Sequence, residues 1–435
     1  MDDYRKWLLP STIFMLAAAL GIVLYFYLIG SPASSDQNNP KIAYLDMSSG
    51  NKGIYLASWT DQRNGNNDIV GAMINPRETT VKTNFPLTAA PASQSEPVVA
   101  ANTKDKEFLV VWQDQRNGSF RDIYGQRVKY DGSLIGINFV ISMAIDDQIN
   151  AALAYGKKMN QYLVVWQDYR NAGTTLTDIY GQWVSHDGKL IGSNFVITKY
   201  TANSYEVSVA YNSTDDEFLI VWEDDRSKTV GNNNIYGQRI SSAGNLLGSE
   251  IAISTALKDQ IRPEIAYNAS NKMYLVVWQD LRSSSITDPD IYGQRIKNTG
   301  ALDGSNFAIS TASAYQGGRL SIATETQSFL VTFDDTRNLS TTGGDIYAQR
   351  VSVSGALLGS NFAISLQKDA KSRSSVAHAG PDGSYLVIWE DWRNISSTGT
   401  DIYGQHVAID GSLIVTTANV NFLLSVLTVS GQLKP

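Results

Sequence analysis

Short runs of apolar residues, each followed by a polar turn, recur along most of the chain. One run begins at Phe108 and reads FLVVWQDQRN. Runs rich in β-branched and aromatic residues and broken by Gly, Asn and Asp predict β-strands. The key aromatic residue of these runs recurs every 53 to 56 residues, at Trp59, Trp112, Trp166, Trp222, Trp278, Phe333 and Trp389. The pattern therefore predicts seven copies of one β-rich unit.

Each unit contains four predicted strands. The first carries an alanine, the second ends in the aromatic residue, the third reads DIYGQR and the fourth reads NFVIS or a variant. Asp131-Gly132 separates the third and fourth strands of one unit, and Asp-Gly favours a tight hairpin turn. Four strands in a repeat of this length are typical of a propeller blade. We predict an all-β, seven-bladed β-propeller of four-stranded antiparallel blades, with a linear β-solenoid as the main alternative.

The recurring alanine predicts the orientation of each blade. Where seven blades converge on one axis, large side chains cannot all fit, so we expect the alanine-bearing strand to be innermost. The alanines are Ala43, Ala100, Ala154, Ala210, Ala266, Ala323 and Ala377. Extra residues before Phe422 predict an irregular closure of the last blade, with residues 426–429 adding a strand.

The repeat resembles the TolB-type, WD40-like propeller repeats of exported prokaryotic proteins. The resemblance rests on W-[QE]-D-x-R-N, a short loop and D-I-Y-G-Q-R, and it extends from about Lys41 to Ser425. It departs from the family in the residue between Asp and Arg, in the longer unit, and in the first unit, which reads DIVGAM from Asp68. The resemblance implies a propeller fold and a role in protein–protein contacts.

An uncharged apolar stretch precedes the repeats. Trp7 to Ile29 contains no charged residue, and at ~1.5 Å per residue a helix of this length crosses a hydrocarbon core of ~30 Å. Arg5 and Lys6 come just before it, and the first positive residue after it is Lys41. The positive-inside rule therefore places the N-terminus in the cytoplasm and the propeller on the extracytoplasmic side.

These features predict three parts of the chain. Residues 1–30 form a single-pass transmembrane anchor, residues 31–40 a flexible tether, and residues 41–435 the propeller. The tether assignment rests on its Ser, Asn and Pro content. Cleavage near Ala33, among small residues, is the alternative to a retained anchor.

Composition narrows the classes of function. The 435 residues include no cysteine, which excludes disulfides and thiolate nucleophiles. The three histidines, His186, His378 and His406, are not at metal-ligand spacing. The net charge is −7 and no cluster of Lys and Arg stands out, so nucleic-acid binding is not expected. We predict neither a cofactor nor a metal.

An Asp-x-Arg pair follows the aromatic residue in every unit. Residues two apart on a strand share a face, so the aromatic, Asp and Arg side chains should line one side of the strand end. Seven equal copies favour a structural role, with a cation held between this Asp and the one opening the third strand as the alternative. In five units the motif comprises Trp112, Asp114, Arg116, Trp166, Asp168, Arg170, Trp222, Asp224, Arg226, Trp278, Asp280, Arg282, Trp389, Asp391 and Arg393.

Two further polar features repeat. A glutamine recurs in the third strand, as at Gln126, and we expect it to form hydrogen bonds between blades. Asn-x-Ser/Thr sequons, at which a glycan could project outward, start at Asn117, Asn212, Asn268, Asn338 and Asn394.

The loops from second to third strand differ between units in length and in residues. They carry Phe120, Tyr169, Ile286 and Trp392 in or beside them, which are candidate partner-binding residues. Seven similar blades also offer a surface large enough for a protein partner. We therefore predict a protein-binding or scaffold subunit of a membrane or cell-surface assembly, without catalytic activity.

Two other functions remain open. A carbohydrate-binding surface module would need the same exposed aromatic residue in several blades, and the loops do not show one. A propeller hydrolase or lyase would need unique acidic, Arg or His residues near the axis. The sequence pattern points to no such cluster that breaks the repeat.

Overall fold

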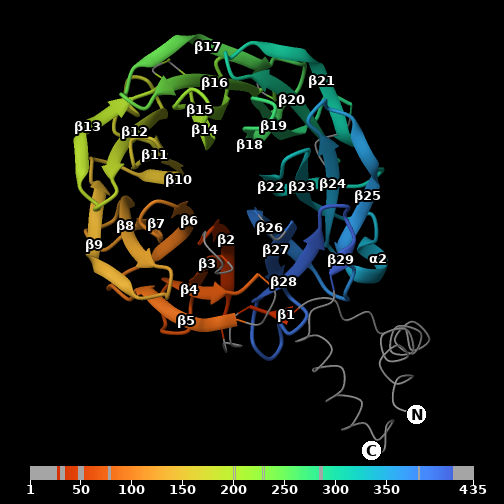
Figure 1. Cartoon of the computed structure of the whole chain (residues 1–435), viewed down its shortest axis with the longest axis horizontal. Helices are drawn as coiled ribbons and strands as arrows, with labels where there is room; N and C mark the ends of the chain where they lie inside the picture. The colour runs from red at the N-terminus through yellow and green to blue at the C-terminus, as the bar shows by residue number, and fades with distance from the viewer. Residues whose placement is uncertain are drawn as a thin grey trace, which may run out of the picture.

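Seven β-sheets stand around a central axis (Figure 1). The computed structural model describes residues 27–29, 35–47, 53–76, 80–198, 200, 202–227, 229, 231–283, 288–380 and 383–414. Six sheets have four antiparallel strands and the seventh has five. The predicted all-β, seven-bladed propeller is therefore confirmed.

The blades follow one another along the chain. Blade 1 comprises β2 (Gln37–Leu45), β3 (Ile54–Asp61), β4 (Asp68–Ile74) and β5 (Thr80–Thr88). Blade 2 comprises β6 (Gln94–Asn102), β7 (Glu107–Asp114), β8 (Asp122–Lys129) and β9 (Leu134–Ser142). Blade 3 comprises β10 (Gln148–Gly156), β11 (Gln161–Asp168), β12 (Asp178–Ser185) and β13 (Leu190–Val196). Blade 4 comprises β14 (Ser204–Asn212), β15 (Glu217–Asp224), β16 (Asn234–Ser241) and β17 (Leu246–Ser254).

The second half of the ring repeats this order. Blade 5 comprises β18 (Gln260–Asn268), β19 (Met273–Asp280), β20 (Asp290–Lys297) and β21 (Leu302–Ser310). Blade 6 comprises β22 (Gln316–Thr324), β23 (Ser328–Asp335), the short helix α2 (Leu339–Thr342), β24 (Asp345–Ser352) and β25 (Leu357–Ser365). Blade 7 comprises β26 (Lys371–His378), β27 (Ser384–Asp391), β28 (Asp401–Ala408) and β29 (Leu413–Ile414), together with β1 (Tyr27–Leu28).

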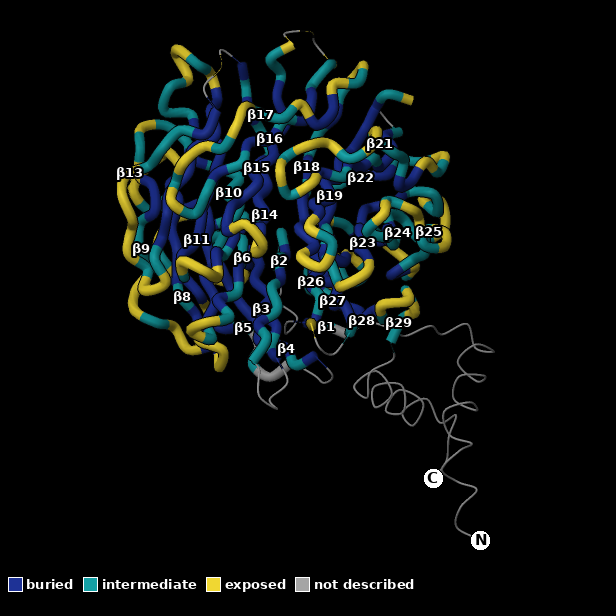
Figure 2. Tube along the Cα trace, turned by 45° about the horizontal axis from the view of Figure 1, so that its top comes forward, coloured by how far each residue is buried: buried dark blue, intermediate teal, exposed yellow. Residues whose placement is uncertain are grey.

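The alanine-bearing strand is innermost in every blade, as predicted (Figure 1). Ala100, Ala154 and their equivalents in later blades are buried where the strands converge. The second strand of each blade is buried along almost its whole length (Figure 2). It packs on both sides: in blade 2, Leu109 and Val111 cluster with Trp166 of blade 3, and Phe108 and Val110 cluster with Leu56 of blade 1. The core therefore lies between the blades.

The ring closes through the start of the chain. Tyr27 and Leu28 pair with Tyr403 and Gly404 of β28, so β1 takes the outer position that a fourth strand holds in other blades. Ile29 is fully buried and packs between blades 7 and 1. A Cβ atom at Gly404 would lie 2.7 Å from Ile29 Cδ1, so the side chain of Ile29 packs closely on this glycine. The strand expected at residues 426–429 lies outside the described residues.

The described strands extend beyond the expected boundaries of the propeller. β1 lies within the stretch predicted as the anchor, and β2 begins at Gln37, within the predicted tether. No helix in the described part of the chain is long and apolar enough to cross a membrane. Residues 1–26, which make up most of the predicted anchor, lie outside that part.

Candidate functional site at the propeller axis

The start of each innermost strand carries a β-bulge. In β6 the pairing with β7 shifts between Ser95 and Val98, and Glu96 has a φ of 54°. A non-glycine residue with positive φ is uncommon, and a bulge re-aims its side chain. The equivalent residues all have positive φ: Asn39, Glu96, Asn150, Glu206, Arg262, Gly318 and Arg373. We call these seven residues the bulge ring.

The bulge ring lies near one face of the propeller. Gln94 at the start of β6 pairs with Asp114 at the end of β7, which pairs with Asp122 at the start of β8. Glu96 therefore lies at the same end of its blade as the loop from second to third strand. We call this end of the propeller the loop face.

The residues of the bulge ring differ from blade to blade, although the structure of the blades repeats. It is asparagine in blades 1 and 3, glutamate in blades 2 and 4, and arginine in blades 5 and 7. In blade 6 the bulge is longer, because the pairing shifts between Gly317 and Ser321, and Arg319 follows Gly318. At the bulges, blades 2 and 4 therefore carry a negative charge, and blades 5, 6 and 7 carry a positive charge.

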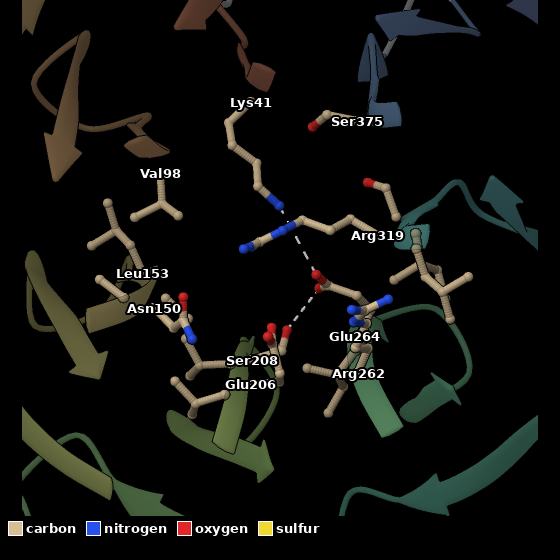
Figure 3. A pocket seen from close by; sticks show the side chains of 18 of the residues that line it. Lys41, Val98, Asn150, Leu153, Glu206, Ser208, Arg262, Glu264, Arg319 and Ser375 are labelled. Carbon is tan, nitrogen blue, oxygen red and sulfur yellow. Dashed lines mark hydrogen bonds and ion pairs between the residues drawn. The ribbon is translucent and has the colours of Figure 1, made fainter. Parts of the chain in front are cut away.

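The innermost strands enclose a cavity of about 250 Å³, lined by all seven blades (Figure 3). This volume is slightly below that of typical ligand pockets, which measure ~300–1,000 Å³. The charged residues that line it are Lys41, Glu96, Glu206, Arg262, Glu264 and Arg319. We call it the axial cavity.

Arg319 reaches across the axial cavity from blade 6 to blade 2. Its Nη2 lies 3.0 Å from Glu96 Oε2, and its side chain is 29% exposed. Burial lowers the pKa of Arg319, but the surrounding carboxylates, with that of Glu96 the strongest, raise it overall. The guanidinium is therefore a fixed positive charge in the middle of the cavity.

Two carboxylates face the cavity from neighbouring blades (Figure 3). Glu264 accepts a hydrogen bond of 2.9 Å from Ser208 Oγ, and its Oε1 lies 4.0 Å from Lys41 Nζ. Among the described residues, the carboxylate of Glu206 and the guanidinium of Arg262 form no hydrogen bond or ion pair with a side chain. These two groups retain their hydrogen-bonding capacity for a ligand.

In four blades the residue between the aromatic residue and the Asp of the motif accepts a hydrogen bond from the bulge of the next blade. Glu223 Oε2 accepts the backbone N–H of Arg262 at 3.2 Å, and Asp334 Oδ1 accepts that of Arg373 at 3.0 Å. Glu390 Oε1 accepts the N–H of Asn39 at 2.6 Å. In the same way, Gln113 Oε1 accepts the backbone N–H of Asn150 in blade 3. We call these residues latch residues.

The acidic latch residues are buried behind the positively charged side of the cavity. Burial raises the pKa of Glu223 to about 7, and the nearby Glu206 adds to this shift. Burial likewise raises the pKa of Asp334 and of Glu390. A Cβ atom at Gly318 would overlap the carboxylate of Asp334, so glycine is needed in the longer bulge.

The Asp and Arg of the motif form an ion pair in every blade. In blade 5, Trp278 Nε1 donates to Asp280 Oδ2 at 2.7 Å, and Arg282 Nη2 lies 2.6 Å from the same oxygen. The guanidinium of Arg282 also stacks on the ring of Tyr292. Within the described residues no group of three or more His, Cys, Asp or Glu side chains could hold a metal. These contacts occupy the carboxylate with groups of its own blade.

The glutamine of the third strand does not form the expected bonds between blades. Gln126 Nε2 donates to the carbonyl oxygens of Arg127 and Ile135, and its Oε1 accepts from Asn138, all within blade 2. The bond between blades is formed instead by Asn138, whose Nδ2 donates to the carbonyl of Leu87 in blade 1. The expectation for glutamine was wrong because strand 4 lies nearer to it than the next blade does.

The sequon asparagines are engaged within the fold. Asn268, for instance, is buried, and its Nδ2 donates to Thr324 Oγ1 at 2.8 Å. Asn117 Nδ2 donates to Asp122 and to the hydroxyl of Tyr124. A glycan on these nitrogens would displace such contacts.

The loop residues proposed for partner binding differ in exposure. Phe120 is 49% exposed and Trp392 is 42% exposed, both on the loop face. Tyr169 is half-buried, and its hydroxyl accepts a hydrogen bond from Gln167. Ile286 lies outside the described residues. The structure does not bring these residues together into the axial cavity.

Comparison with known proteins shows similarity of fold. No family model matches the chain, and no curated protein matches it. A protein of unknown function from Dyadobacter fermentans superposes with a TM-score of 0.51 and 9% identity, over 88% of this chain and 97% of that one. The Hadza microbial sialidase Hz136 gives 0.50 and 10%, over 84% of this chain and 75% of that one. The GH93 α-L-arabinofuranosidase of Fusarium graminearum gives 0.48 and 13%, over 76% and 98%.

These findings correct two predictions. The resemblance to TolB-type repeats holds for the propeller fold only, since the similar solved structures include a sialidase propeller. The interpretation as a scaffold without catalytic activity is wrong on these comparisons. It also relied on the absence of unique acidic and arginine residues near the axis, whereas Glu206, Glu264 and Arg319 meet there.

A signal for this site was present in the chain. Within the first strand, the position two residues after Gln94 and its equivalents is Asn, Glu, Asn, Glu, Arg, Gly and Arg in blades 1 to 7, so its charge changes from blade to blade. The loops from second to third strand vary between blades as well, and their variation is more conspicuous because their lengths also differ. The bulge decides which position of the first strand faces the axis. The bulge itself arises from the pairing between the first and second strands.

Proposed function

We propose that this protein acts on carbohydrate and cleaves a glycosidic bond in the axial cavity. The observation that carries the proposal is the pair of carboxylates, Glu206 and Glu264, on adjacent blades beside the positive charges of Arg262 and Arg319. Most glycoside hydrolases use two carboxyl groups that flank the scissile bond. The similar solved propellers named for sialidase and arabinofuranosidase activity support the choice of carbohydrate.

The carboxyl groups of Glu206 and Glu264 would have different roles in the reaction. One carboxyl group donates a proton to the leaving oxygen, while the other, ionised, acts on water or on the anomeric carbon. The small cavity suits one sugar residue at a chain end. Exposed Trp392 and Phe120 on the loop face would contact the rest of a longer chain by stacking.

A panel of oligosaccharides incubated with the purified protein tests this proposal. We expect release of a reducing sugar from at least one of them. Glu206→Gln and Glu264→Gln should each lower the rate at least tenfold, because an amide can neither give up a proton nor act as a nucleophile. Glu325→Gln, on the opposite face, is the matched control and should retain the rate. No turnover of any oligosaccharide, or full activity of both cavity variants, would contradict the proposal.

We also propose that the propeller is anchored outside the cytoplasmic membrane. Because Tyr27 belongs to β1, the uncharged stretch available for the anchor runs from Trp7 to Phe26. As a helix at ~1.5 Å per residue it still spans about 30 Å, and Arg5 and Lys6 keep the same orientation. Protease added to cells whose outer envelope has been removed should digest the propeller. Digestion only after membrane lysis would argue for a cytoplasmic propeller.

A further inference from the structure

Arg319 is set apart from the other charged residues of the axial cavity by its position. It lies in the one bulge that is longer by a residue, directly after Gly317 and Gly318. Among the described residues, Glu96 is the one side-chain partner of its guanidinium. A guanidinium offers five N–H donors, so most of them are available to a ligand inside the cavity.

The Glu96 carboxylate occupies the position at which a ligand anion would pair with Arg319. It is 20% exposed, belongs to a blade on the far side of the axis, and reaches the guanidinium at 3.0 Å. Guanidinium binds carboxylates through paired hydrogen bonds of fixed geometry. Arg262, with no side-chain partner among the described residues, lines the same cavity from the blade next to Arg319.

We propose that the sugar bound in the axial cavity is acidic, and that its carboxylate replaces Glu96 as the partner of Arg319. This inference rests on the proposed function and adds the class of substrate, a uronic acid or another carboxylated sugar. Glu96 then serves as an internal competitor that neutralises Arg319 while the cavity is empty. Glu206 and Glu264 remain available for the bond to be cleaved.

Equilibrium binding to matched pairs of sugars tests the inference. Galacturonate and glucuronate oligosaccharides are compared with their neutral galactose and glucose counterparts by calorimetry. The wild-type protein should bind the acidic member at least tenfold more tightly. Arg319→Gln should abolish this preference and leave binding of the neutral sugar within about twofold. Glu96→Gln should tighten binding of the acidic sugar several-fold, because the competing charge is removed.

The control is Glu107→Gln, which breaks an ion pair with Arg127 at the other end of blade 2 and should not change either affinity. Thermal unfolding checks that each variant is folded. Equal binding of acidic and neutral sugars, or weaker acidic binding by Glu96→Gln, would overturn this inference and leave the proposed function standing. Failure to bind any sugar would overturn both. A sulfated galactose oligosaccharide, measured in the same way, that binds more tightly than the galacturonate oligosaccharide would also reject the carboxylate.

Discussion

Replacing Asp280 by alanine is expected to lower the free energy of unfolding by about 3–5 kcal/mol. The carboxylate is fully buried and accepts hydrogen bonds from Trp278 Nε1, from the backbone N–H of Arg282 and from its guanidinium. Its removal leaves a buried indole N–H without its acceptor and a largely buried positive charge without a carboxylate, since the other acceptors of the Arg282 guanidinium, Ser254 Oγ and Asn306 Oδ1, are neutral. Chemical denaturation followed by tryptophan fluorescence measures the loss.

The equivalent change in blade 4 provides an internal comparison. Asp224 forms the same bonds to Trp222 and Arg226, but Arg226 Nη1 also lies 2.7 Å from Glu250 Oε2. The guanidinium keeps this second carboxylate when Asp224 is removed. Asp224→Ala should therefore destabilise the protein less than Asp280→Ala does.

Two further variants complete the test. Trp222→Ala should cost about 3–5 kcal/mol through lost packing, because its ring is fully buried between blades. Asp187→Ala, in an exposed turn, should leave the melting temperature almost unchanged. An unchanged melting temperature in Asp280→Ala or Asp224→Ala, together with lost ligand binding, would assign the motif to function instead of structure.

Replacing Glu223 by glutamine is expected to stabilise the protein above pH 7. Burial raises the pKa of Glu223 from 4.5 to about 7 in the folded state, so the folded protein binds a proton there more tightly than the unfolded chain. This group therefore favours folding most below pH 4.5. Its contribution falls as the pH rises to about 7 and is then constant. At 1.36 kcal/mol per pKa unit the fall amounts to about 3 kcal/mol.

Glutamine is a suitable replacement because the protein uses it at the same position. Gln113 is the latch residue of blade 2, and its Oε1 accepts the backbone N–H of Asn150. At position 223 the amide oxygen can accept the N–H of Arg262 in the same way. Its NH₂ group would then face Asn233, whose own amide can rotate to present oxygen.

Denaturation midpoints of wild type and Glu223→Gln, measured from pH 5 to pH 8, test this prediction. The difference in unfolding free energy should move in favour of the variant as the pH rises toward 7. Gln113→Glu is the converse variant and should introduce a similar pH dependence into blade 2. A difference between wild type and Glu223→Gln that does not change with pH would show that Glu223 is ionised throughout the range.

Much of the scaffold could be predicted because its determinants are local. The run FLVVWQDQRN and the Asp131-Gly132 turn indicate a strand and a hairpin within a few residues of chain. Repetition of such segments determined the number of blades, since each blade needs a neighbour on both sides to cover its apolar faces. The recurring alanine also indicated which strand is innermost.

The candidate site could not be predicted from such local patterns. Glu96, Glu206 and Arg319 belong to three different blades, and more than a hundred residues separate successive members of this set. Closure of the ring brings them to one axis, and β1, from the start of the chain, completes that ring against β28. The bulges then turn these side chains into the axial cavity.

The sequence by itself determined the repeating blade, its strand order and the chemistry of its structural motif, because each depends on contacts between residues close in the chain. Only the tertiary structure decided which non-repeating charges face one another. Arg319 and Glu96 pair across the cavity, while Glu223 is buried behind Arg262 with a raised pKa. Such electrostatic properties depend on distance and burial in space, and neither quantity is encoded in any single repeat.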